Sequence, residues 1–354
     1  MVLRIALVAV AAAAALLPLD PTIVERWYST GIYVRIQRVL TPISNLLPVA
    51  WLDIISIAAV VGLGWVWWRT LRTAGEPVWR RVRRAALTTT TILVVAYITF
   101  LTLWGLNYRR VAMPHRLALQ DHSPSTRDVV NLGREAIARL NSAHAGAHNT
   151  GWAEDAWRNE SMRRAFADVQ RQLADGPLSV PGRLKSTLFG IFFRWSAVDG
   201  MVNPFGLEVL ANPDLLPFER PFVAAHEWAH LAGFADEAEA NFVGWLTTLR
   251  ADSASQYSGW LYLYWQIAGE LPPDDRRLLA RDLQAGPRAD VAAIAARLRR
   301  GDLPLLRRAT WMVYDSYLKA NRVEEGVRSY GAVVDLILRA RFEDDWRPVR
   351  RPSP

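Results

Sequence analysis

Three apolar runs dominate the first third of the sequence. They cover residues 2–19, 49–68 and 85–108, and few polar side chains interrupt them. The second and third runs have about the 20 residues that an α-helix needs to cross the hydrocarbon core of a bilayer. The first run is shorter and rich in Ala, as a cleaved signal peptide would be, but we expect a retained anchor because further apolar runs follow it. The pattern predicts a membrane domain at 1–108 with three transmembrane helices.

Arginines in the short connections between these runs predict an orientation. Short loops that are rich in Lys and Arg stay in the cytoplasm. In the first connection, acidic residues partly balance the arginines. The connection between the second and third runs is strongly basic and holds a single acid, Glu76, beside Arg69, Arg72, Arg80, Arg81, Arg83 and Arg84. We therefore expect this connection in the cytoplasm and everything after residue 108 outside it.

From residue 109 onward, apolar positions recur with the period of amphipathic helices. Gly and Asn interrupt this pattern at 143–151, and we expect His144 and His148 to lie there in a solvated loop. Residues 181–218 are rich in Gly, Pro, Asn and aromatic side chains and include β-type pieces such as 205–210. After Pro221 the pattern is helical nearly to the end. The sequence predicts a mainly α protein, in which 109–354 form a largely helical domain with a small β element.

Composition narrows the chemistry available to this domain. The chain has 354 residues, is 51% hydrophobic and contains no Cys, so any transition-metal site has to use His and carboxylate ligands. The formal net charge of +8 raises nucleic acid as a partner. However, many of the arginines lie beside apolar runs, and no basic and aromatic motif accompanies them. We expect a lipid bilayer, and no nucleic acid, as a partner.

The segment at 222–242, FVAAHEWAHLAGFADEAEANF, carries the candidate chemistry. His226 and His230 are four residues apart, so on a helix both imidazoles project from one face. Two such nitrogens can bind one Zn²⁺ at about 2.0–2.1 Å. Glu227 follows the first ligand, where a carboxylate can act as general base toward a zinc-activated water. We favour metal binding over the alternative of a buried, hydrogen-bonded His pair.

Three carboxylates compete for the third ligand position. Asp236 follows His230 at the spacing of metzincin-type sites, whereas Glu237 begins an E-x-x-A-N string close to the E-x-x-A-D string of gluzincin-type membrane peptidases. Glu239 lies two residues further on. Because positions 237 and 239 diverge by about 200° on a helix, they cannot both face one metal. We rank Glu237 first, Glu239 second and Asp236 third.

The stretch GMVNPFGLEVLANPDLLPFERPFVAAHEWAHLAGFADEAEANF resembles the core of a bacterial domain-of-unknown-function family, numbered 3810, and the likeness continues into VYDSYLKANRVEEGVRSYGAVVDL. The family's Gly-x-x-x-Glu-x-Glu-Ala-Asn-Phe pattern is matched from Gly233 to Phe242, and Asp236 falls on a variable position of it. The resemblance implies a three-span protein of the bacterial inner membrane with a gluzincin-like site, and it favours Glu237 over Asp236.

Two further segments are candidates for the substrate site. The segment at 203–210, NPFGLEVL, is either an extended edge that pairs with a peptide substrate or an ordinary core strand. Glu208 within it is a candidate surface or substrate-amine contact. Arg328 and Tyr330 are candidates for polarising the scissile carbonyl and stabilising the oxyanion, although for a lone Tyr on a helix we favour a core position.

Together these patterns predict a membrane-anchored, zincin-like zinc metallopeptidase that acts on a peptide or protein substrate. Its catalytic domain is expected outside the cytoplasm, with His226, His230 and one acid as zinc ligands. Glu227 is the expected general base. The alternative is a non-proteolytic zinc-binding membrane sensor or assembly factor, in which the metal site is structural.

Overall fold

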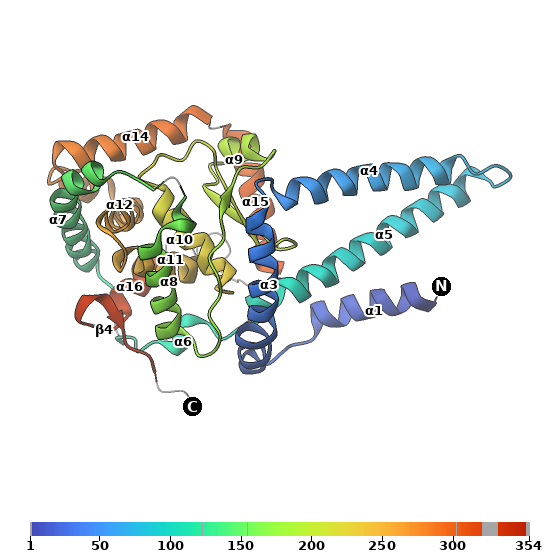
Figure 1. The fold of residues 1–354 in the computed structure, drawn as a ribbon, viewed down its shortest axis with the longest axis horizontal. Coiled ribbons are helices and arrows are strands. Elements are labelled where there is room, and N and C mark those ends of the chain that lie inside the picture. The colour runs from blue at the N-terminus through green and yellow to red at the C-terminus, as the bar shows by residue number, and fades with distance from the viewer. Residues whose placement is uncertain (1, 122, 154, 302, 321–331, 352–354) are drawn as a thin grey trace.

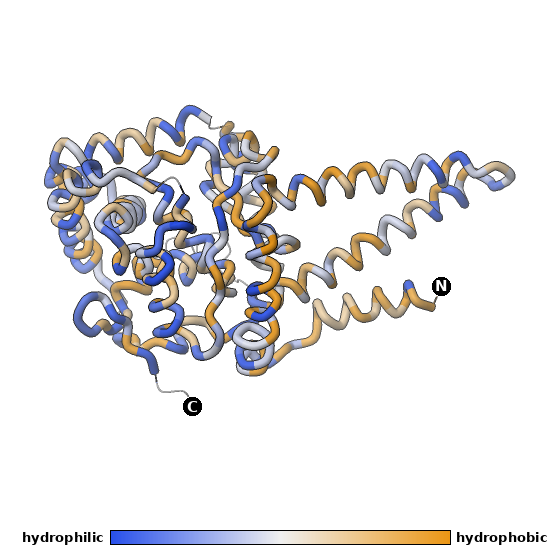
Figure 2. The backbone as a smooth tube through the Cα atoms, viewed as in Figure 1, coloured by the Kyte–Doolittle hydropathy of each residue, from blue (hydrophilic) through white to orange (hydrophobic). Residues whose placement is uncertain are grey.

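The structure is a computed structural model that describes residues 2–121, 123–153, 155–301, 303–320 and 332–351. It is mainly helical with small sheets, as the sequence predicts. Apolar helices project from one side of a larger helical body (Figure 1). Much of their sequence is hydrophobic, and hydrophilic residues gather near the turn at their far end (Figure 2).

Two of these helices, α4 (Trp51–Leu71) and α5 (Val78–Leu103), are long and apolar enough to cross a membrane. They pack against each other and are joined by a turn far from the helical body (Figure 1). The chain presents large apolar side chains such as Val60 and Leu93 to the outside of this pair. Helix α5 begins before the apolar run does, so the arginines at 80–84 form its first turns.

The first apolar run forms a shorter helix, α1 (Val2–Leu16), which packs against α5. Its 15 residues span only about 22 Å, less than the thickness of a bilayer core. The following helical stretch, Pro21–Leu46, lies at 107° to it, and the bent pair counts as a third span only if both parts are taken together. The structure therefore contains two helices of membrane length, or up to three.

The stretch 21–46, which reads in the sequence as a plain connection, is helical and docks on the body. It consists of α2 (Pro21–Ile23), a π-helical segment η1 (Val24–Ile32) and α3 (Tyr33–Leu46). The buried Tyr33 hydroxyl donates to the Leu231 carbonyl at 2.9 Å, and the Thr41 hydroxyl donates to the Leu207 carbonyl at 2.7 Å. Part of this stretch shares one hydrophobic core with residues beyond 108.

Helix α7 (Thr126–Thr150) corrects one expectation. We expected a break at 143–151, but the helix runs through it and ends only at Gly151, which has φ +78°. A capping box of Ser125 and Asp128 starts the helix, and extensive packing against α12 (Ser253–Glu270) holds its later turns. Such tertiary packing overrides the low helix propensity of Gly and Asn.

A three-stranded sheet lies beside the central helices. The order is β1 (Leu184–Lys185), β3 (Glu208–Ala211), β2 (Gly200–Asn203), and β3 runs parallel to β1 and antiparallel to β2. Strand β3, which lies in the NPFGLEVL segment, is therefore the middle strand of the sheet. The segment forms an ordinary core strand and not an extended edge for a peptide substrate. Glu208 is fully buried and is not a surface contact.

The centre of the body is α10 (Arg220–Leu231), buried along nearly its whole length between α11 (Glu237–Leu249) and α12. The glycine at 244 lets α11 approach closely, because a Cβ there would lie 2.9 Å from the backbone nitrogen of His226. The remaining elements surround this centre: η2 (Gly105–Arg109), α6 (Met113–Arg116), η3 (Ala156–Arg158), α8 (Glu160–Leu173), α9 (Gly190–Ser196), α13 (Pro273–Ala280), α14 (Ala285–Gly301), α15 (Pro304–Ala320), α16 (Ala332–Arg339), β4 (Phe342–Glu343), η5 (Asp344–Trp346) and β5 (Arg347–Pro348).

Candidate metal centre

The turn between α10 and α11 brings one carboxylate back to the two imidazoles. Gly233 has φ +81°, a conformation that favours glycine, and a Cβ there would lie 2.8 Å from the Asn107 side chain. Asp236 caps α11 by accepting from the Glu239 backbone N–H at 3.1 Å. Helix α11 therefore starts at Glu237, whose side chain reaches the imidazoles of α10.

The three side chains converge on one small volume. His226 Nε2 lies 3.4 Å and His230 Nε2 3.5 Å from Glu237 Oε2. Ligands about 2.05 Å from a tetrahedral Zn²⁺ are separated by roughly 3.3 Å, so both distances suit a shared ion. His230 Nδ1 lies 2.8 Å from the Phe234 carbonyl oxygen, a contact that turns Nε2 toward Glu237.

The electrostatics of the three groups match this donor set. Burial raises the pKa of the Glu237 carboxyl, but His230 and His226 outweigh burial and hold that pKa well below its ordinary value. Burial lowers the pKa of His230, yet Glu237 raises it overall to about 9. An ionised carboxylate beside two imidazoles is a compact site for positive charge. Two His, one Glu and an open position make up one of the donor sets of catalytic zinc sites, so these residues fit zinc.

Glu227 lies beside this cluster, with the ionisable side chains of His226, Glu237 and Asp199 around it. Its side chain is buried, and its Oε2 accepts no hydrogen bond from the described residues. Burial raises the pKa of its carboxyl to about 7. Strand β2 passes close by, because a Cβ on Gly200 would lie only 2.5 Å from Glu227 Oε1. The absence of a side chain at 200 thus leaves room for this carboxylate.

A cavity of about 340 Å³ opens onto His226 and Glu227. Much of its lining is aromatic: Phe218, Phe222, Tyr262, Trp265 and Trp311. Arg297 closes one side through ion pairs with Asp199 at 2.9 Å and Glu219 at 2.6 Å. The cavity has the size, and a mainly apolar wall with several polar groups, that are typical of a small-ligand or side-chain pocket.

Tyr262 is a polar group in this cavity that sequence reasoning missed. Its ring stacks on Phe222 with centroids 3.5 Å apart, and its buried hydroxyl has no hydrogen-bond partner among the described residues. Burial raises the pKa of this hydroxyl well above its ordinary value, so it stays a donor. In the sequence, Tyr262 is one of several aromatic residues on α12, and nothing in their spacing distinguishes it.

The other two acidic candidates do not join the imidazoles. Glu239, ranked second as a ligand, points away from the imidazoles and accepts from the Met113 backbone N–H at 2.6 Å. Asp236 serves as the helix cap. Arg328 and Tyr330 lie outside the described residues. Among the three competing carboxylates, Glu237 is therefore the one that the fold brings to His226 and His230.

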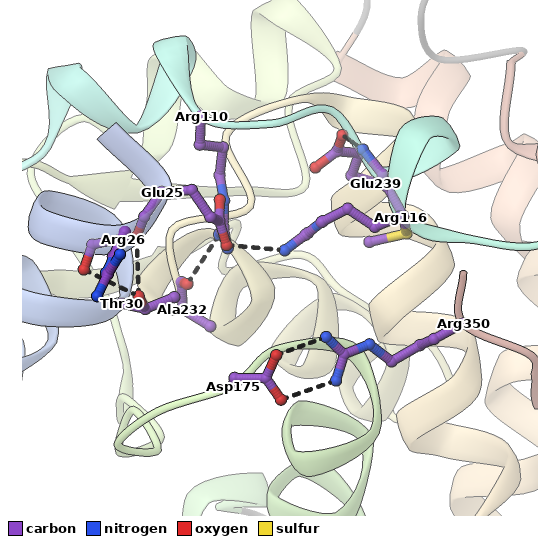
Figure 3. A network of polar contacts seen from close by, with 10 residues as sticks. Glu25, Arg26, Thr30, Arg110, Arg116, Asp175, Ala232, Glu239 and Arg350 are labelled. Carbon is purple, nitrogen blue, oxygen red and sulfur yellow. Dashed lines mark hydrogen bonds and ion pairs between the residues drawn. The ribbon is translucent and has the colours of Figure 1, made fainter. Parts of the chain in front are cut away.

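A network of charged side chains converges on Glu25, lies near Glu239, and ties the centre to the N-terminal helices (Figure 3). Glu25 of η1 pairs with Arg110 at 2.7 Å and with Arg116 at 2.9 Å. Arg110 also donates to the Ala232 carbonyl, at 3.4 Å, in the turn that follows α10. These contacts connect the segment after α1 to the turn that positions Glu237.

Comparisons with known proteins give one result. Neither a curated protein nor a solved structure matches the chain. The family model described as "Protein of unknown function (DUF3810)" matches residues 28–338, which include both membrane-length helices and the centre around His226. The match covers most of the chain and agrees with the family that the sequence resembles. The protein therefore belongs to the DUF3810 family.

Proposed function

We propose that this protein is a membrane-anchored zinc-dependent peptidase with Glu227 as its general base. The observation that supports the proposal most is the convergence of His226 Nε2, His230 Nε2 and one Glu237 oxygen beside a cavity that Glu227 also lines. Zinc, when bound, acts as a Lewis acid that makes water nucleophilic at neutral pH.

The protein's own residues supply the proton transfers. We assign Glu227 to take a proton from the attacking water and to deliver it to the leaving amine. Its Oε2 accepts no hydrogen bond from the described residues, which supports this role. The hydroxyl of Tyr262 lines the same cavity and has no acceptor among the described residues, so we assign it to the developing oxyanion. Tyr330, the sequence candidate for this role, lies outside the described residues and stays a prediction.

Substrate binding follows from the elements around the cavity. Strand β2 is an edge strand among the described strands, since it pairs with β3 alone, and it passes beside Glu227. An extended peptide can pair with such an edge through its backbone. The aromatic cavity then suits a large apolar side chain of the substrate. The substrate edge is thus 200–203 and not the neighbouring 208–211.

The arrangement of the helices supports an extracytoplasmic catalytic domain in a bacterial inner membrane. Helices α1, α4 and α5 leave the body on one side, and the turn between α4 and α5 lies at their far end (Figure 1). That turn is flanked by the arginines at 69, 72 and 80–84. If these arginines stay in the cytoplasm, the body lies on the opposite face of the membrane.

The decisive experiment measures hydrolysis and zinc content together, with the full chain in detergent micelles and a quenched-fluorescent peptide library. Glu227→Gln should keep its zinc and lose activity by about 10²–10⁴-fold, the usual contribution of a general base. Tyr262→Phe should lose about 10²–10³-fold, as expected for an oxyanion donor. Tyr264→Phe is the matched control, because Tyr264 lies on the same helix but does not line the cavity.

Unchanged hydrolysis in Glu227→Gln would exclude the proposed mechanism. A wild-type protein that binds zinc and cleaves no member of the library would favour the non-proteolytic zinc protein instead.

A further inference from the structure

A second cluster of two His and one carboxylate lies apart from the centre at His226. His144 and His148 project from one face of α7 toward Asp290 on α14, and the ligand atoms of the three lie within 4.8 Å of one another. His148 Nε2 is 2.9 Å and His144 Nε2 3.5 Å from Asp290 Oδ2. These distances bracket the roughly 3.3 Å between ligands of a tetrahedral zinc ion.

The fold makes room for this cluster. A Cβ at residue 286 would lie 2.4 Å from Cε1 of His144, so Gly286 allows the ring to lie against α14. The buried Tyr257 hydroxyl donates to Asp290 Oδ2 at 2.5 Å and orients the carboxylate. An outer hydrogen bond of this kind commonly holds a ligand in place in metal sites.

The cluster is also open to solvent on its imidazole side. The side chain of Asp290 is 10% exposed, whereas those of His144 and His148 are 26% and 35% exposed. An ion can therefore reach the imidazoles from water, while the carboxylate behind them is held by the protein.

We propose that His144, His148 and Asp290 bind a second divalent transition-metal ion, with Zn²⁺ as the ion that this donor set suits. Imidazole nitrogens favour zinc and its neighbours over Mg²⁺ and Ca²⁺, which prefer oxygen ligands. The same atoms can instead form a plain hydrogen-bonded cluster of His148, Asp290 and Tyr257. That cluster binds no zinc, so metal analysis separates the two.

The position of the cluster gives the ion a structural effect on the cavity. Ile294 and Arg297 follow Asp290 on α14 and line the cavity wall. The Phe218 ring, another part of that wall, lies 6.1 Å from the ring of His148. An ion that ties α7 to α14 would hold this wall in place. The proposal does not depend on hydrolysis, because its test measures metal.

The experiment removes the first centre and asks whether zinc binding persists. We use the full chain in detergent micelles, equilibrate it with micromolar Zn²⁺ and measure the zinc content and the melting temperature. The His226→Ala/His230→Ala variant should still bind one zinc per chain, and zinc should raise its melting temperature. Adding His144→Ala and His148→Ala should abolish both effects. Adding Asp290→Asn instead, which keeps an acceptor for the Tyr257 hydroxyl, should weaken binding at least tenfold.

His115→Ala, in the same background, is the matched control because His115 is exposed and belongs to neither cluster. It should keep the zinc. A folded His226→Ala/His230→Ala variant that takes up no zinc would overturn the proposal, as would zinc that persists without His144 and His148. If that variant fails to fold, the wild type should hold two zinc ions per chain and His144→Ala/His148→Ala one. Equal zinc contents in the wild type and in His144→Ala/His148→Ala would also overturn the proposal.

Discussion

At the scale of single residues, a short turn selects one carboxylate out of three. Gly233 reverses the chain after α10, Asp236 caps the next helix, and Glu237 becomes its first residue. Glu239 lies only two positions later, yet it faces the Met113 backbone and the arginines at 110 and 116. Side chains two positions apart on a helix point about 200° away from each other. This difference explains why Glu237 and Glu239 take such different roles.

The first prediction compares these two buried glutamates. Glu237→Gln should weaken zinc binding by more than about 100-fold, because it removes a direct ligand. Loss of a residue that only hydrogen-bonds to a ligand weakens binding by at most about 100-fold. Glu239→Gln should keep the zinc and lower the free energy of unfolding by about 1–3 kcal/mol, because it weakens a buried polar network. Zinc titration and denaturant unfolding of both variants measure these effects. The same loss of zinc in both would contradict the assignment.

At the scale of secondary-structure elements, one buried side chain joins the sheet to the apolar helix α4. Glu208 of β3 accepts from the backbone N–H groups of Trp51 and Leu52 at 2.9 and 2.8 Å, at the start of α4. Lys185 of β1 pairs with the same carboxylate at 3.0 Å, and both side chains are fully buried. The carboxylate thus satisfies free N–H groups at the start of α4 and lies at the positive end of its dipole.

The second prediction concerns this connection. Glu208→Gln should lower the free energy of unfolding by about 3–5 kcal/mol, because the buried Lys185 ammonium loses its counter-charge. Glu135→Gln is the control, since Glu135 forms an exposed pair with Arg139 within α7 and should change stability by less than about 0.5 kcal/mol. Denaturant unfolding in micelles compares the two. If both variants change the free energy of unfolding by similarly small amounts, the buried pair of Glu208 and Lys185 contributes little to stability.

The third prediction concerns pH and the C-terminal strand region. Arg350 donates two hydrogen bonds to Asp175, at 2.9 and 2.7 Å (Figure 3). These bonds lower the pKa of the Asp175 carboxyl below its ordinary 3.8. A lowered pKa stabilises the fold above the ordinary value, and this contribution disappears as pH falls through the lowered one. Because Asp175 is largely exposed, the contribution is at most about 1 kcal/mol.

Asp175→Asn should therefore reduce stability slightly at neutral pH, and its difference from the wild type should close below pH 3.8. Urea unfolding at neutral and acidic pH measures the difference. A gap that persists unchanged at acidic pH would argue against the ion pair as its cause.

At the scale of the whole molecule, apolar helices and a helical body meet along α3 and the segment before it. Tyr33 and Thr41 bond the body directly, and Glu25 links to the turn after α10 through Arg110. The apolar helices and the candidate metal centre therefore share one packed unit. If α4 and α5 cross a membrane, as we propose, the proposed active site lies close to its surface.

The fourth prediction tests the orientation of this unit. A reporter that works only outside the cytoplasm should be active when fused after residue 354, and a cytoplasmic reporter should be active when inserted at 73–76 between α4 and α5. The arginines around that turn give the physical reason. The opposite pattern of activities would place the helical body in the cytoplasm.

What the sequence by itself determined is local or compositional. Apolar runs of sufficient length predict membrane helices, and the described residues contain two helices, or up to three, that are long and apolar enough to cross a membrane. The His226 and His230 spacing places both imidazoles on one helix face, because helical periodicity alone sets that relation. The family resemblance is confirmed by the match over residues 28–338. Zinc binding and hydrolysis stay predictions.

Only the tertiary structure decided which distant groups meet. It brought Glu237 and not Glu239 to the imidazoles, placed the Tyr262 hydroxyl in the cavity, and made β2 the edge strand. It also continued α7 through a Gly-containing stretch that reads as a loop and so joined His148 to Asp290, 142 residues away. The reason is physical: periodicity reports which face a side chain takes on its own element, whereas its partners depend on how whole elements pack.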